Sequence, residues 1–130
     1  MTASQNLKVN WKTVPTRTIT AGGVEFAYQE LGTNNPGTPV VFLIHLAAVL
    51  DNWDPRVVDG FAASRRVITF DNRGVGASSG APATSIEQMA TDAITFIRAM
   101  VRARHRRTFN SEWRCCRQAS MVRAPILRAN

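Results

Sequence analysis

VITFDNRGVGASSG, residues 67–80, is the stretch of sequence that decides the fold. Residues 67–70 are β-branched or aromatic, which is typical of a strand covered on both faces. The segment that follows, from Asp71 to Pro82, is rich in glycine and serine and therefore predicts a loop. A strand buried on both faces belongs to a sheet that lies between helices, so this stretch predicts an α/β fold.

Two segments upstream supply further strands. Residues 40–44, VVFLI, are continuously apolar and predict a second strand buried on both faces. Residues 16–20 and 24–30 predict an antiparallel hairpin, because the Gly22-Gly23 pair between them takes up positive φ without steric cost. The sheet is therefore expected to open with a hairpin and to continue with parallel strands.

Two helices are expected between and after these strands. Asp54 followed by Pro55 is typical of a helix N-cap with proline in the first turn, and Ser85 with Gln88 matches a capping box. The first helix has an apolar face made by Val57, Val58, Phe61 and Ala62. The second helix runs to Met100 with an apolar stripe made by Ile86, Met89, Ala90, Ala93, Ile94, Ile97 and Met100.

Charge divides the chain of 130 residues, which has a net charge of +7. Residues 1–100 hold eight basic and eight acidic side chains, whereas residues 101–130 hold eight arginines and only Glu112. The apolar periodicity is also lost after Val101, so the sequence predicts an irregular basic tail. The expected organisation is an N-terminal extension over 1–15, a folded domain over 16–100 and an arginine-rich tail over 101–130.

The sequence argues against several classes of function. Cys115 and Cys116 are adjacent and cannot form an ordinary disulfide with each other, and together with two distant histidines they match no zinc-ligand spacing. Ser79 stands where a dinucleotide-binding loop needs its third glycine. The apolar run over 40–50 is too short to span a bilayer, and residues 1–10 lack a secretory signal pattern. We expect a cytoplasmic protein that binds no metal, cofactor or membrane.

Two motifs in one strand-helix-strand frame resemble those of the α/β-hydrolase superfamily. The first is His45-Leu46-Ala47-Ala48 after a strand, and the second is D-x-R-G-x-G-x-S, residues 71–78, after the next strand. The resemblance covers about residues 16–100 and is nearest to cofactor-free esterases, lactonases and haloperoxidase-like members. It implies the N-terminal part of an α/β-hydrolase sheet: an antiparallel hairpin plus two parallel strands with flanking helices, followed by the basic tail.

The resemblance also implies a serine hydrolase that acts on ester, lactone or related acyl bonds of a small molecule. In such enzymes a serine attacks the carbonyl, a histidine takes its proton and an acid orients that histidine. The loop after the first parallel strand lends a backbone N–H to the oxyanion hole. By the match, Ala47 is the candidate donor, with Leu46 beside it. The family usually has His-Gly where this chain has His45-Leu46. Leucine does not adopt glycine's conformations freely, so the Ala47 N–H need not point in the direction it has in the family.

Other candidate catalytic residues are weighed against plainer roles. His45 precedes any position where the family places its nucleophile, so we interpret it as a hydrogen-bonded residue that shapes the loop. Ser78 lies in a literal G-x-S-x-G, but five residues separate Phe70 at the strand end from Gly76 at the start of this motif, and the nucleophile elbow requires direct entry from the strand. We therefore interpret Ser78 as part of the loop motif. His105 matches no family position.

The segment that carries the nucleophile, the acid and the base in the family has no counterpart in the sequence. We therefore expect a truncated hydrolase that is inactive alone, with a tail that could derive from a displaced reading frame. Residues 40–44 would then lack their neighbouring central strand, which predicts an uncovered strand edge, exposed apolar surface and self-association.

Two other functions remain open on the sequence. The arginine-rich tail could bind nucleic acid or another acidic surface, with Phe109 and Trp113 stacking on bases, although a solvated tail is the simpler interpretation. The uncovered strand edge could instead recruit a separate polypeptide by strand addition.

Overall fold

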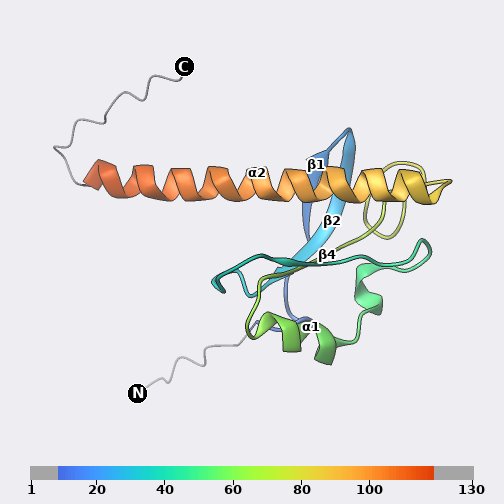
Figure 1. Cartoon of the computed structure of the whole chain (residues 1–130), viewed down its shortest axis with the longest axis horizontal. Coiled ribbons are helices and arrows are strands. Elements are labelled where there is room, and N and C mark those ends of the chain that lie inside the picture. The colour runs from blue at the N-terminus through green and yellow to red at the C-terminus, as the bar shows by residue number, and fades with distance from the viewer. Residues whose placement is uncertain (1–8, 119–130) are drawn as a thin grey trace. The chain divides into compact units, whose positions relative to one another are not determined.

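The computed structural model describes residues 9–118 and shows a four-stranded mixed sheet with helices (Figure 1). Its strand order is β1-β2-β4-β3, with antiparallel pairing of β2 to β1 and β4 and parallel pairing of β3 to β4. The elements are β1 (Arg17–Ala21), β2 (Val24–Leu31), β3 (Val40–Phe42), the 3-10 turn η1 (Leu50–Asn52), α1 (Pro55–Ala62), β4 (Val67–Phe70) and α2 (Ile86–Gln118). This arrangement confirms the predicted N-terminal part of an α/β-hydrolase sheet.

Local sequence signals explain where the elements begin. Gly22 and Gly23 have φ of 57° and 77° and join β1 to β2 with Ala21 opposite Val24, the conformation that a type I′ turn demands. The Asp54 side chain accepts a hydrogen bond of 2.9 Å from the Arg56 N–H and so caps α1. These predicted starts are confirmed.

One face of the sheet packs against α1. Val58 of α1 is fully buried in a cluster with Leu31, Phe42 and Val67 from three strands. Trp11 and Val14, which the sequence places in an N-terminal extension, are buried in the same cluster. The Trp11 N–H also donates to the Asp59 carboxylate of α1 at 2.8 Å. Trp11 and Val14 therefore belong to this core.

The other face of the sheet carries an aromatic core around Phe96 of α2. Phe96 is fully buried, stacks on Phe70 with ring centroids 4.2 Å apart and meets Phe26 edge-on at 5.6 Å. The predicted apolar stripe of this helix is therefore wrong at three positions, because Ile86 and Ile94 are 74% and 49% exposed and Ala90 is exposed as well. The aromatic rings of the sheet accept Phe96, and this contact sets which side of the helix faces inward.

The predicted end of the second helix near Met100 is also wrong. Helix α2 continues to Gln118, through the segment expected to be irregular. Residues 86–118 contain no proline or glycine, and arginine and alanine have high helix propensity, so the segment stays helical after its apolar stripe ends. By its internal contacts the chain divides into two units, Met1–Ala99 and Met100–Asn130.

Candidate active site

Two loops meet at the carboxyl ends of the parallel strands β3 and β4. Asp71, the first residue after β4, accepts a hydrogen bond of 2.7 Å from the Leu50 N–H through Oδ1. The Asn72 side-chain amide donates to the carbonyl oxygens of Ile44 and His45 at 3.2 and 3.3 Å. The loop after β4 thus fixes the main chain of the loop after β3 at three points.

The same Asp71 carboxylate also shapes its own loop. Its Oδ2 accepts from the Ala77 N–H at 3.0 Å, and the carboxylate is buried. Gly76 has a φ of 56°, and a Cβ built there would lie 2.3 Å from Oδ2. Only glycine lets the backbone pass this close to the carboxylate. The second glycine of D-x-R-G-x-G-x-S is therefore required by the Asp71 contact.

Ser78 joins this loop to the sheet. Its side chain is buried, with Oγ donating to the Asp71 carbonyl at 2.8 Å and accepting from the Ala27 N–H at 2.9 Å. The neighbouring Ser79 is exposed, and its Oγ accepts from the Glu25 N–H at 2.8 Å. The hydroxyl proton of Ser78 is held by a main-chain carbonyl, and no histidine contacts it among the described residues. This geometry agrees with a structural role for Ser78.

Leu46 and Ala47 lie in the exposed part of the loop after β3, and 43% of Leu46 is exposed. The next N–H, that of Ala48, closes a tight turn by donating to the His45 carbonyl at 3.2 Å. Within the described residues, the N–H groups of Leu46 and Ala47 donate no hydrogen bond. Two backbone donors are therefore left available at the carboxyl edge of the sheet.

His45 shapes the loop in a different way from that expected. Its carbonyl accepts hydrogen bonds from both Ala48 and Asn72, whereas its imidazole is exposed and forms no hydrogen bond with any described residue. The sequence predicts that the His45 ring forms the hydrogen bonds that shape the loop, but the His45 main chain forms them. His105 is exposed on α2, and the side chains of Phe109, Trp113, Cys115 and Cys116 lie outside the described ones.

Sequence reasoning missed two contacts that hold the site. The Arg73 guanidinium donates to the Asp92 carboxylate at 3.0 Å, which ties the loop after β4 to α2. Trp53 packs edge-on against Phe42 with ring centroids 4.9 Å apart and supports the loop after β3. The arginine of D-x-R-G was a visible signal, but its carboxylate partner lies 19 residues further on.

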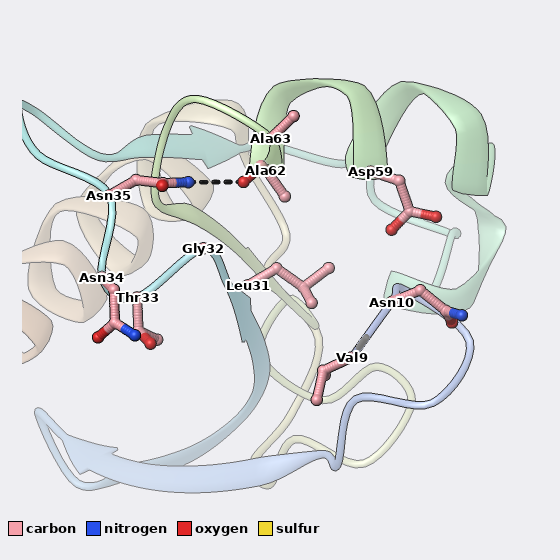
Figure 2. Close-up of a pocket in the computed structure, with 10 residues that line it drawn as sticks. All are labelled: Val9, Asn10, Leu31, Gly32, Thr33, Asn34, Asn35, Asp59, Ala62 and Ala63. Atoms are coloured by element: carbon pink, nitrogen blue, oxygen red, sulfur yellow. Dashed lines mark hydrogen bonds between the residues drawn. The ribbon is translucent and has the colours of Figure 1, made fainter. Parts of the chain in front are cut away.

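A separate pocket of about 720 Å³ opens at the other end of the strands (Figure 2). It is lined by Leu31, whose strand position pairs with Val67 at the start of β4, and by the end of α1. The Asn35 amide donates to the Ala62 carbonyl at 2.6 Å across its wall, as Figure 2 shows. This pocket lies at the amino end of β4, away from the loops that hold Asp71 and Ala47.

The described residues contain no group of three or more His, Cys, Asp or Glu side chains placed to hold a metal ion. Among them, no helix combines the length and the apolar character needed to cross a bilayer.

The chain is similar to known proteins in both sequence and structure. Residues of this chain are 37% identical over 78 positions to a Mycobacterium tuberculosis protein named "Putative non-heme bromoperoxidase BpoC", covering 59% of this chain and 29% of that one. The structure matches an alpha/beta hydrolase fold protein from Chitinophaga pinensis with a TM-score of 0.64 and 40% identity, over 68% of this chain and 32% of that chain.

A second solved structure is also similar to this chain. It is CarC, a serine hydrolase involved in carbazole degradation, with a TM-score of 0.53 and 30% identity, over 66% of this chain and 33% of that chain. No protein-family profile matches the chain. The chain spans about a third of the length of the relatives it matches.

Proposed function

We propose, from the premise that this chain carries the N-terminal portion of an α/β-hydrolase fold, that it contributes the oxyanion-hole loop of a serine hydrolase. The expected substrates are small molecules with ester, lactone or related acyl bonds. Support comes from the serine hydrolase CarC, which is similar over two thirds of this chain. A cytoplasmic location is part of the proposal, because the two adjacent cysteines offer no disulfide framework.

The single observation that carries the proposal is the locked pair of loops at the carboxyl edge. Asp71 and Asn72 hold the main chain at Leu50, Ile44 and His45, and the segment between these points presents the free N–H groups of Leu46 and Ala47. An oxyanion hole needs donors whose direction is fixed before the reaction, because reorientation would cost free energy in the transition state. Donors held by a buried carboxylate meet that requirement.

The chemistry assigned to this chain is charge stabilisation and not bond making. When a nucleophile adds to an acyl carbonyl, negative charge develops on the carbonyl oxygen, and backbone N–H groups stabilise it. The described residues bring together no serine, histidine and carboxylate in hydrogen-bond contact. We therefore propose that the chain is inactive by itself and that nucleophile, acid and base lie outside residues 9–118.

The first test measures turnover of a p-nitrophenyl ester by the full chain, together with labelling by a fluorophosphonate probe. We expect no turnover above the buffer rate and no labelling. Turnover or labelling that Ser78→Ala abolishes would overturn both the inactivity and the structural role of Ser78.

The second test asks whether this chain's loop can serve catalysis. Residues 16–100 replace the corresponding segment of the carbazole-pathway hydrolase CarC, and ester turnover is compared with that of the parent enzyme. We expect the chimera to retain activity and Ala47→Pro, which removes one N–H, to lower kcat by about a hundredfold to a thousandfold. Leu46→Pro serves as the matched variant, with a smaller loss. Equal kcat in all three chimeras would contradict the proposal.

A second candidate is binding of a polyanion through the basic part of α2. Arg102 and Arg106 lie one helical turn apart and are exposed, and Arg107 is exposed beside them. Binding of labelled RNA should then weaken steeply with salt, and Arg102→Gln with Arg106→Gln should reduce the slope by about two. RNA binding that neither salt nor this double variant alters would reject this candidate.

A further inference from the structure

One edge of β3 is free among the described residues. In the described residues β3 ends the sheet and pairs only with β4. The Val40 N–H donates to the Arg66 carbonyl of the preceding turn at 2.8 Å. Because main-chain groups alternate in direction along a strand, the N–H and C=O of Val41, and of Leu43 just beyond the strand, point away from β4.

The surface beside this edge is apolar. Leu43 is 61% exposed and Phe61 of α1 is 48% exposed, and the Phe61 ring lies 5.7 Å from that of Phe42 in β3. No Asp, Glu, Lys or Arg occurs between residues 36 and 50. Natural edge strands are commonly protected from pairing by charged side chains, bulges or a covering element. This edge has no charged side chain to keep a second strand away.

We propose that the β3 edges of two copies of this chain pair antiparallel across a two-fold axis. The axis would pass beside Phe42, so that Val41 faces the partner's Leu43 and both residues exchange N–H to C=O hydrogen bonds. The two four-stranded sheets would then form one continuous sheet of eight strands. The apolar side chains of Leu43 and Phe61 would be covered at the same time.

One observation favours a second copy over another occupant. An edge that meets itself across a two-fold axis brings like side chains together, and the absence of charge over 36–50 removes the repulsion this would otherwise cause. The edge is accessible to a strand from either source, since among the described residues β4 is the only strand that pairs with β3. A separate polypeptide that supplies a strand is the competing occupant.

The test measures the mass of the full chain by sedimentation equilibrium over a wide range of concentration. We expect a monomer-dimer equilibrium for the unaltered chain and a monomer for Leu43→Lys, which places a charge on the edge. Ile86→Lys is the matched control, because it adds the same charge at an exposed isoleucine at the start of α2, and it should dimerise normally. Circular dichroism checks that both variants stay folded.

Amide hydrogen exchange supplies a readout that does not depend on the variants. Val41 and Leu43 amides should exchange more slowly as the concentration of the unaltered chain rises, with no such change at Ile86. A chain that stays monomeric, a dimer that Leu43→Lys leaves intact, or a stoichiometric complex with a different polypeptide in its place would each overturn the proposal. Ester turnover enters none of these measurements, so failure here leaves the oxyanion-loop proposal standing.

Discussion

At the scale of single residues, Asp71 and Ser78 each satisfy two partners from different parts of the chain. The two carboxylate oxygens of Asp71 accept from Leu50 and Ala77, and the Ser78 hydroxyl joins the Asp71 carbonyl to the Ala27 N–H of β2. Buried polar groups left without partners cost free energy. Removing either side chain would therefore destabilise the fold both by the lost hydrogen bonds and by the buried main-chain groups left without a partner.

Replacing Ser78 tests this role. Ser78→Ala leaves the buried Ala27 N–H and Asp71 carbonyl without a partner, so we expect the free energy of unfolding to fall by about 1–3 kcal/mol. Ser79→Ala is the control, because Ser79 is exposed and water can replace its hydroxyl; its effect should be within about 0.5 kcal/mol. Urea denaturation measures both, and equal losses would contradict the distinction between the two serines.

The carboxyl of Asp54 gives a prediction about pH. Hydrogen bonds from the Arg56 side chain and then from the Arg56 N–H lower the pKa of Asp54 from 3.8 to about 2. Because the pKa is lower in the folded state, the stabilisation by this N-cap is present above pH 3.8 and is lost as the pH falls through about 2.

An NMR titration of the Asp54 carboxyl carbon measures this pKa. Arg56→Ala should raise it toward 3.8, while the hydrogen bond from the backbone N–H at position 56 keeps it below that value. An Asp54 pKa of 3.8 in the unaltered chain would contradict the hydrogen bonds from Arg56 to the Asp54 carboxylate.

At the scale of elements, one aromatic side chain of α2 packs among the rings of the sheet. Phe96→Ala removes a fully buried ring that touches Phe26, Phe70 and Tyr28, so we expect a loss of about 3–5 kcal/mol in the free energy of unfolding. Ile94→Ala, on the exposed side of the same helix, should cost less than about 0.5 kcal/mol. Thermal or urea unfolding of the two variants tests which side of α2 faces the sheet.

The elements that the sequence predicted correctly are those with local signals. Gly22-Gly23, Asp54-Pro55 and Ser85 mark their turn and helix starts through contacts within a few residues. The inward side of α2 has no such signal, because apolar residues lie on two sides of the helix between Ile86 and Met100. Phe96 lies outside the predicted stripe, and the rings that accept it come from β2 and β4, which are distant in the sequence.

The candidate site was predictable to a similar extent. D-x-R-G-x-G-x-S located the loop, and the resemblance supplied Leu46 and Ala47 as candidates. The bond between Asp71 and Leu50 joins residues 21 apart through a main-chain N–H, which leaves no pattern in the side chains. The same holds for Asn72, whose partners are carbonyl oxygens.

At the scale of the molecule, the apolar surface beside β3 predicts dye binding and low solubility. Leu43, Leu46, Val57 and Phe61 are between 43% and 61% exposed. An apolar dye such as ANS should therefore fluoresce in the presence of the folded chain, with less signal per chain at concentrations where copies pair. A sharp cooperative melt of a monomer that binds no dye would contradict this.

Asp71 and Asn72 hold the neighbouring loop through its main chain, at the carbonyl oxygens of Ile44 and His45, which every amino acid provides, and at the Leu50 N–H, which only proline lacks. Side chains at 46, 47 and 49 can therefore drift over evolutionary time without releasing the loop. Leu46 stands at the position where the resemblance implies glycine, and the loop still makes these contacts. A library randomised at these three codons should yield mostly folded proteins, whereas one randomised at 71 and 72 should not.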